Sequence, residues 1–422
     1  MKGPAFKKGR PLFLEIMKIT GITAEYNPLH KGHIYQIEQA RSLTDCDAVA
    51  VAMSGDYVQR GEPAILDKWT RCGLALDSGA DLVVEIPVQF CLGNASQYAA
   101  ASVSILEALG CSSISFGSEC GDAGLLSDVA AFLDSDRAGL DEMISKLTKT
   151  GMNYPSARSE AYRRLRRDTG KERLEAELAV LDSPNDILAI EYIRNLRSAA
   201  PVCIKREGAG YSEGIDRGLS FQSAGAIRNE FSGGNDPAQV GEYVPECTLA
   251  ALKREKLTFP DEWSVLLRYA AAMASAETIE DCPSAGEGLG NLLRKYAGEP
   301  DGPEKWGDIV KAVKSKRYTY TRISRLCMQL VLGITRSTLS SEKPLYIRVL
   351  GFNEKGRKIL AGLKSEGAQE LPVITNINKE TQDLSEDAAR MLALDVRAAD
   401  VYNLVTGRGR EFSDHVRKPL NK

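Results

Sequence analysis

The segment 25–34, EYNPLHKGHI, contains two of the three histidines in the chain, His30 and His33, with Gly32 between them. Residues three apart in a helix lie on the same face of one turn. Gly32 has no side chain, so a phosphate could approach the helix N-terminus, where free N–H groups favour anions. Both imidazoles could donate hydrogen bonds to phosphate oxygens and stabilise charge that develops at an α-phosphate under attack. The pattern therefore indicates phosphate chemistry.

Two other interpretations of this segment have to be weighed. Two histidines at a helix start could simply cap the helix, since the motif is only four residues long. A P-loop nucleotide site is excluded, because the sequence contains no G-x-x-x-x-G-K-[ST] pattern. The pair therefore remains a candidate for phosphate chemistry of a different kind.

The surrounding sequence alternates apolar runs with helical patterns. We expect strands over 18–25, 47–54, 80–87 and 111–119, and helices over 30–43, 65–79 and 94–110. This order predicts an α/β fold with a parallel, doubly wound sheet, in which ligands bind outside the carboxyl ends of the strands. The histidine loop follows the first strand at that edge, and Pro28 keeps Asn27 out of the helical region. Lys68 and Arg71, early in the second helix, face the same edge and are further candidates for phosphate or RNA contact.

The remainder of the chain changes character several times. We expect mostly helices over 123–200, one more strand over 201–211, helices over 246–335 and a small α/β unit at the end. The resulting division is a disordered extension over 1–16, an α/β domain over 17–235, a helical domain over 236–340 and a C-terminal α/β unit over 341–422.

Composition limits the class of protein. The chain has 422 residues, a net charge of −3 and 43% hydrophobic residues, which is typical of globular proteins. No apolar run approaches the ~18 residues of a membrane span. The nine cysteines occur singly, without a C-x-x-C pair, so we expect neither disulfides nor a protein metal site, and a reducing, cytoplasmic location.

One stretch is locally basic. KAVKSKRYTYTRISR (311–325) has six Lys or Arg residues, no acidic residue and two tyrosines, Tyr318 and Tyr320. Basic side chains interleaved with aromatic ones suit RNA phosphates and stacked bases. The phosphate candidates are Lys316, Arg317, Arg322 and Arg325. A solvated helix face is the alternative interpretation.

Several motifs together resemble a known family. HKGH resembles the H-x-G-H signature of the nucleotidyltransferase superfamily. AEYNPLHKGH, MSGDYVQRGEPAILDKW, GADLVVEIP and FGSE more closely resemble the bacterial tRNA(Met) cytidine acetate ligases. The likeness continues in SPNDIL (183–188), IKREGAGY (204–211) and KSKRYTYTRISR (314–325).

The resemblance implies a Rossmann-like nucleotidyltransferase domain over 17–235 and a tRNA-binding helical domain over 236–340. It implies an enzyme that makes acetyladenylate and pyrophosphate from ATP and acetate. The acetyl group then passes to the exocyclic amine of the wobble cytidine in elongator tRNA(Met). Mg²⁺ is expected with the triphosphate, held mostly by phosphates and water.

The resemblance also implies a set of site residues. His30 and His33 are the catalytic pair. The implied ATP site consists of Thr23, Ala24, Glu25, Tyr26, Asn27, Pro28, Leu29, His30, Lys31, Gly32, His33, Ile34, Tyr35, Gln36, Gly117, Asn185 and Arg206. Without the resemblance, Gly117 could be a turn glycine, Asn185 a helix cap and Arg206 a solvated side chain.

One loop departs from the family pattern. Where the superfamily carries a Ser/Thr-rich segment before an Ile-Arg pair, this chain reads QSAGAIR (222–228). Ser223 and Arg228 remain candidates for phosphate contact, but a second hydroxyl is replaced by Ala or Gly. Two alternative functions stay open: a small-molecule adenylyltransferase of the same superfamily, and a non-catalytic RNA-binding protein that keeps a relict nucleotide fold.

Overall fold

The computed structural model describes residues 17–166, 170–207, 214–232, 236–286, 288–315, 317–365 and 370–422. The extension predicted over 1–16 lies outside these ranges. Within them, no helix combines the length and the apolar character that a membrane span requires.

The central layer is one sheet, which has eight strands among the described residues, in the order β10-β8-β5-β2-β1-β6-β7, with β9 paired to β8. Strands β1, β2, β5, β6 and β7 are parallel, which confirms the predicted α/β fold with a parallel sheet. The side chains of β2, AVAVAMS, are all buried, as expected of a central parallel strand. The strands are β1 (Ile19–Ala24), β2 (Ala48–Ser54), β5 (Leu82–Ile86), β6 (Ser113–Ser118), β7 (Ala200–Lys205), β8 (Ile347–Phe352), β9 (Val373–Ile374) and β10 (Leu420–Asn421).

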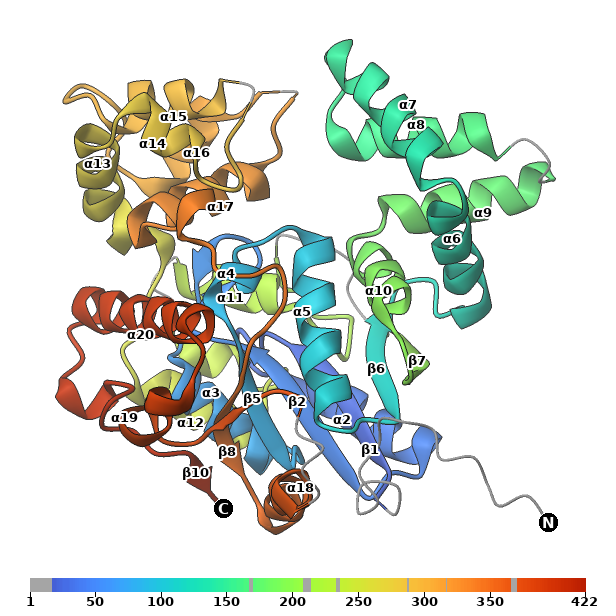
Figure 1. Ribbon diagram of the computed structural model, residues 1–422, viewed down its shortest axis with the longest axis vertical. Coiled ribbons are helices and arrows are strands. Elements are labelled where there is room, and N and C mark those ends of the chain that lie inside the picture. The colour runs from blue at the N-terminus through green and yellow to red at the C-terminus, as the bar shows by residue number, and fades with distance from the viewer. Residues whose placement is uncertain are drawn as a thin grey trace.

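Helices cover both faces of the sheet (Figure 1). One apolar core lies between the sheet and α2 (Lys31–Thr44), α3 (Lys68–Asp77) and α12 (Glu246–Arg254). The core on the other face includes α5 (Ala95–Ala108), α10 (Pro184–Asn195) and α18 (Glu354–Ser365). Asn94 caps α5 through the backbone N–H of Gln97, and Asp67 caps α3 through Trp69 and Thr70.

Two groups of helices rise beyond the carboxyl ends of the parallel strands, the first on the right and the second on the left of Figure 1. The first group is inserted between β6 and β7: α6 (Ala123–Ser135), α7 (Arg137–Lys149), α8 (Tyr154–Leu165) and α9 (Lys171–Asp182). The second group, which we call the helical lobe, comprises α13 (Ser264–Met273), α14 (Ala276–Glu280), α15 (Leu289–Ala297), α16 (Trp306–Val313) and α17 (Tyr320–Leu332). The lobe has its own core, which includes the fully buried Trp263 and Trp306.

Short elements connect these parts. A two-stranded hairpin, β3 (Tyr57–Val58) and β4 (Glu62–Pro63), follows β2 and was not predicted from the sequence. The other short helices are α4 (Val88–Cys91), α11 (Ala224–Ser232) and α19 (Ile377–Glu380). Segment 236–259 was predicted within the helical domain, but its Val240, Tyr243 and Leu252 pack in the core of α2 and α3.

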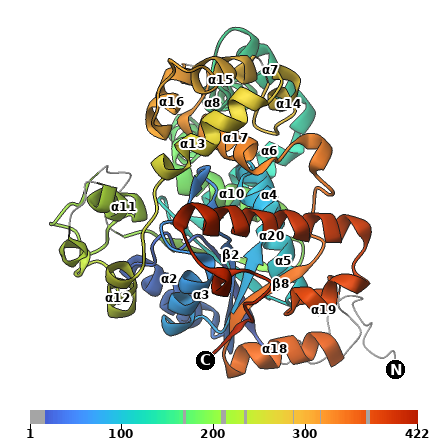
Figure 2. The ribbon, with the colours of Figure 1, turned by 90° about the vertical axis from the view of Figure 1, so that its left-hand side faces the viewer.

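The C-terminal segment, predicted as a small α/β unit over 341–422, is joined to the main sheet. Its strand β8 pairs antiparallel with β5 and β10 pairs with β8, so the segment extends the main sheet. Helix α20 (Glu386–Thr406) runs between the sheet and the helical lobe (Figure 2). Its side chains enter both the sheet core and the core of the lobe. A strand whose partner lies some 260 residues away leaves no local signal of that pairing, although β5 would otherwise be an unprotected edge.

The C-terminal segment also completes a buried charge cluster beneath the sheet edge. Lys68 Nζ lies 2.9 Å from Glu85 Oε1 and 2.7 Å from Asp414 Oδ2, and all three side chains are buried. The expectation that Lys68 contacts phosphate or RNA is therefore wrong. A lysine buried this deeply needs anionic partners inside the protein.

We predict that Lys68→Met lowers the free energy of unfolding by about 3–5 kcal/mol, because two buried carboxylates lose their counter-ion. Urea unfolding of the purified protein measures this loss. The matched control is Lys146→Ala, which removes an exposed ion pair with Glu142 on α7 and should change stability little. Equal effects of the two variants would contradict the assigned role of Lys68.

Candidate active site

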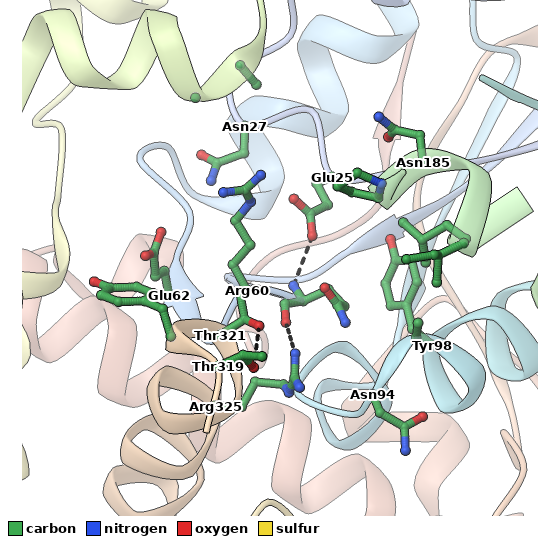
Figure 3. Close-up of a pocket in the computed structure, with 18 of the residues that line it drawn as sticks. Glu25, Asn27, Arg60, Glu62, Asn94, Tyr98, Asn185, Thr319, Thr321 and Arg325 are labelled. Carbon is green, nitrogen blue, oxygen red and sulfur yellow. Dashed lines mark hydrogen bonds between the residues drawn. The ribbon is translucent and has the colours of Figure 1, made fainter. Parts of the chain in front are cut away.

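A cavity of about 1960 Å³ opens at the carboxyl ends of the parallel strands, between the two groups of helices. It brings together most of the site residues predicted from the sequence. Those that line it are Thr23, Ala24, Glu25, Tyr26, Asn27, His30, His33, Gln36, Gly117, Asn185, Arg206, Ser223, Arg228, Arg317, Tyr320, Arg322 and Arg325. Figure 3 shows part of this set.

The loop after β1 is fixed by buried side chains. Asn27 Oδ1 accepts a hydrogen bond from the backbone N–H of Ile65 at 2.9 Å. Arg71 is fully buried and donates to the carbonyl oxygens of Glu25 (2.6 Å) and Ser54 (3.0 Å), and also to those of Leu66 and Gly55. Arg71 therefore positions the strand ends, and the expectation that it contacts phosphate or RNA is wrong.

The two histidines both cap α2 and line the cavity. His30 Nδ1 accepts from the backbone N–H of Gly32 (3.1 Å), and His33 Nδ1 accepts from the backbone N–H of His30 (3.2 Å). Their rings stack with centroids 3.7 Å apart. Because each Nδ1 accepts a hydrogen bond, the proton of each neutral ring lies on Nε2. Capping and phosphate binding are thus compatible, since they use different nitrogens.

The surroundings of the histidines keep both rings neutral. Burial, with the nearby Arg206 and Arg228, lowers the pKa of His30 to about 3. Burial and then His30 and Arg206 hold the pKa of His33 well below its usual value. At neutral pH the site therefore presents two Nε2–H donors without carrying imidazolium charge.

The β3–β4 hairpin connects the histidine loop, which follows β1, with the helical lobe. Glu25 Oε1 accepts from the backbone N–H of Gln59 (2.9 Å), and Ser324 Oγ on α17 donates to the carbonyl of Gly61 (2.9 Å). Gly61 has a φ of 81°, and a β-carbon there would collide with the backbone of Arg325. Glycine is thus required both by the left-handed conformation and by the close approach of the two backbones.

Two motifs far apart in sequence meet on the opposite side of the cavity. The carboxylate of Glu119 accepts from the backbone N–H of Asp186 (2.9 Å) and from the side-chain amide of Asn185 (2.6 Å). The carboxylate of Asp186 in turn accepts from the backbone of Glu119 (2.9 Å) and from the hydroxyl of Ser118. This reciprocal arrangement fixes Asn185, at the start of α10, beside β6.

Arg206 lies against Gly117 in the neighbouring strand. A β-carbon at Gly117 would be 3.3 Å from Arg206 Cγ, so the absent side chain makes room for this arginine. Gly117 lies within β6, and the alternative of a turn glycine is wrong.

The segment that differs from the family pattern, QSAGAIR (222–228), leads into helix α11. Ser223 Oγ accepts from the backbone N–H of Ala226 at 3.1 Å and so caps this helix. Arg228 donates to the carbonyl of Asn27, and burial lowers the pKa of its guanidinium. Both residues line the cavity beside the histidine loop.

The basic segment divides into residues with different surroundings. Arg317 is exposed at the cavity, whereas Tyr318 is buried in the core of the lobe, so the expectation that Tyr318 stacks on a base is wrong. Arg322 donates to the carbonyls of Ser284 and Ala285. Lys316 lies outside the described residues.

A few residues of the predicted ATP segment do not line the main cavity. Gly32 and Tyr35 line a smaller adjoining cavity of about 40 Å³, together with both histidines. Lys31 is exposed and Ile34 packs against the apolar core. Pro28 and Leu29 are buried.

Two charged residues in the hairpin were not predicted from the sequence. Arg60 and Glu62 line the cavity (Figure 3), and burial raises the pKa of the Glu62 carboxyl although Arg228 and Arg60 act against it. Their signal was a glycine-containing polar turn, QRGE, a few residues after the second predicted strand. No side chains of the inserted helices were selected either, yet Tyr154 and Arg158 of α8 line the cavity.

Comparisons with known proteins agree with this geometry. A family model described as HIGH Nucleotidyl Transferase matches residues 17–415. The tRNA(Met) cytidine acetate ligase of Clostridium perfringens is 34% identical over 412 residues, which cover 96% of this chain and 99% of the relative. That of Clostridium novyi is 36% identical over 417 residues, with the same coverage. The chain belongs to the tRNA(Met) cytidine acetate ligase family.

Solved structures related to this ligase family have the same fold. The apo crystal structure of Thermotoga maritima TmcAL superposes with a TM-score of 0.87 at 30% identity, covering 96% of this chain and 99% of that one. A second crystal structure of that protein, bound with alpha-thio ATP, gives a TM-score of 0.85 at 32% identity. The resemblance and the fold class inferred from the sequence are therefore confirmed.

The depressed histidine pKa values predict how this member of the ligase family responds to acid. The unfolded chain protonates His30 below about pH 6.5, while the folded protein does so only near pH 3. The unfolded state binds more protons in that window, so the free energy of unfolding falls as the pH falls, by up to about 1.4 kcal/mol per pH unit for one such group.

In His30→Asn, which retains an acceptor for the helix cap, this part of the pH dependence should disappear. Urea unfolding of wild type and variant between pH 7 and pH 4, on the order of four conditions, measures the difference in slope. Identical slopes would show that folded His30 titrates at its ordinary pKa.

Proposed function

We propose that this protein activates acetate with ATP and transfers the acetyl group to the exocyclic amine of the wobble cytidine in elongator tRNA(Met). The full-length similarity to tRNA(Met) cytidine acetate ligases supports this function. The observation that carries it at the level of chemistry is the pair of neutral histidines at the cavity. We also propose a cytoplasmic location, in line with the scattered single cysteines.

In the first step a carboxylate oxygen of acetate attacks the α-phosphorus of ATP. The bond from that phosphorus to the bridging oxygen breaks, and pyrophosphate leaves. The Nε2–H groups of His30 and His33 donate to non-bridging oxygens, where negative charge increases in the transition state. Arg206 and Arg228, beside the histidines, compensate the charge of the phosphates.

In the second step the cytidine amine attacks the acetyl carbonyl, AMP leaves and the amine loses a proton. The cavity extends from the histidines to the helical lobe, where Arg317 and Lys311 line it. This continuity supports a macromolecular acceptor, since a small adenylyltransferase substrate would not need the second wall. We propose that Arg317 and its neighbours contact tRNA phosphates.

Mg²⁺ would neutralise the triphosphate when bound. No cluster of three or more His, Cys, Asp or Glu side chains that could hold a metal ion occurs among the residues that the structure describes. We therefore propose that the ion takes its ligands mainly from phosphate oxygens and water.

We predict acetate-dependent exchange of labelled pyrophosphate into ATP without tRNA. His33→Asn, which keeps a cap acceptor but loses the Nε2–H donor, should lower the exchange rate about 100-fold or more. Glu38→Ala, an exposed change on the same helix, is the matched control and should exchange like wild type.

The choice of acceptor separates this function from its alternatives. Exchange with acetate, and not with formate, propionate or a pantetheine-type phosphate, is the expected result. Exchange only with the phosphorylated compound would favour a small-molecule adenylyltransferase. Tight tRNA binding without any exchange would favour a non-catalytic RNA-binding protein.

A further inference from the structure

The Arg325 side chain makes a hydrogen bond within the protein and is more buried than a side chain that only contacts RNA phosphates needs to be. Its Nη1 donates to the carbonyl oxygen of Gln59 at 3.3 Å. The backbone N–H of Gln59 in turn donates to Glu25 Oε1 at 2.9 Å. Figure 3 shows one of these hydrogen bonds as a dashed line from Glu25 and the other as a dashed line from Arg325. Because Glu25 directly follows β1, these two hydrogen bonds link the Arg325 guanidinium, which lines the cavity, to the histidine loop.

The backbone around Arg325 is held firmly. The preceding residue, Ser324, donates to Gly61 and accepts from the indole N–H of the buried Trp306 at 3.3 Å. Gly61 packs directly on this turn of α17, so the backbone of Arg325 has no space to shift toward the hairpin. Arg325 is therefore preorganised, which suits recognition of one defined group.

The guanidinium retains hydrogen-bonding capacity that the protein does not use. No carboxylate among the described residues pairs with Arg325, and its buried Nε has no acceptor there. Burial lowers the pKa of Arg325 to about 10, with Arg322 adding to the effect. A buried N–H donor without an acceptor is costly, which is typical of a group whose partner is a ligand.

The position favours a base over a phosphate as that ligand. The cytidine amine must reach the acyl group at the nucleotide loop, so the base has to enter the inner end of the cavity while its backbone stays outside. Cytosine presents two adjacent acceptors, O2 and N3, next to the reacting amine. Uracil presents an N3–H donor instead, which would face the guanidinium donors.

We propose that Arg325 reads the target base, donating to O2 and N3 of cytosine and thereby leaving the exocyclic amine directed at the acyl group. This inference rests on the proposed function and identifies the residue that selects the acceptor. Arg317, which is exposed and lines the cavity, keeps the role of a phosphate contact.

The test compares two tRNA(Met) transcripts that carry C or U at the acceptor position, in binding measurements without ATP. Wild type should bind the cytidine transcript about tenfold more tightly or better. In Arg325→Met and in Arg325→Lys, which keeps the charge but lacks the fork, that ratio should fall to about one. Arg317→Ala should weaken both transcripts equally and preserve the ratio.

Acetate-dependent pyrophosphate exchange, which needs no tRNA, provides the second readout. Both Arg325 variants should exchange within about twofold of wild type while acetyl transfer to tRNA is lost. Thermal unfolding of Arg325→Lys verifies that the lobe stays folded.

An unchanged C-to-U ratio would overturn the proposal, as would a loss of exchange equal to the loss of transfer, which would assign Arg325 to acetate or phosphate. Absence of exchange in wild type would instead count against the proposed function, because base discrimination is scored separately.

Discussion

A single buried guanidinium holds the carboxyl ends of β1 and β2 in place. Arg71 donates to the carbonyl oxygens of Glu25 and Ser54, and the loops that follow these two residues build the nucleotide site. One rigid donor group therefore sets the spacing of both loops. The histidine loop and the β3–β4 hairpin therefore start from fixed positions, which in turn fix the positions of their side chains at the cavity.

The parallel sheet and the position of the histidines were predictable because their signals are local. Apolar runs, the cap at Asn94 and glycine stops define strands β1, β2, β5 and β6 and helices α2, α3 and α5 without any knowledge of distant contacts. The roles of Lys68 and Arg71 were not predictable, because a cation early in a helix looks the same whether it faces solvent or a buried carboxylate such as Asp414. Pairing of β8 with β5 and the depth of Arg325 likewise depend on contacts between distant segments.

The site combines neutral donors with a cationic surround. His30 and His33 offer Nε2–H groups whose orientation is set by the caps that their Nδ1 atoms make, so helix geometry and chemistry share the same rings. The reciprocal hydrogen bonds between Glu119 and the Asn185–Asp186 segment orient Asn185 in a similar way. The same hydrogen bonds that satisfy backbone N–H groups thus also orient the side chains that face the nucleotide.

Completion of the sheet by β8 and β10 has a consequence for biosynthesis. The first strands leave the ribosome long before Asp414 is made, so a nascent chain carries an open edge at β5 and an ammonium group at Lys68 with only part of its counter-charge. Open edges invite pairing with other chains, which makes this intermediate a natural client for chaperones. The order of synthesis therefore leaves the edge of β5 unpaired until β8 has been made.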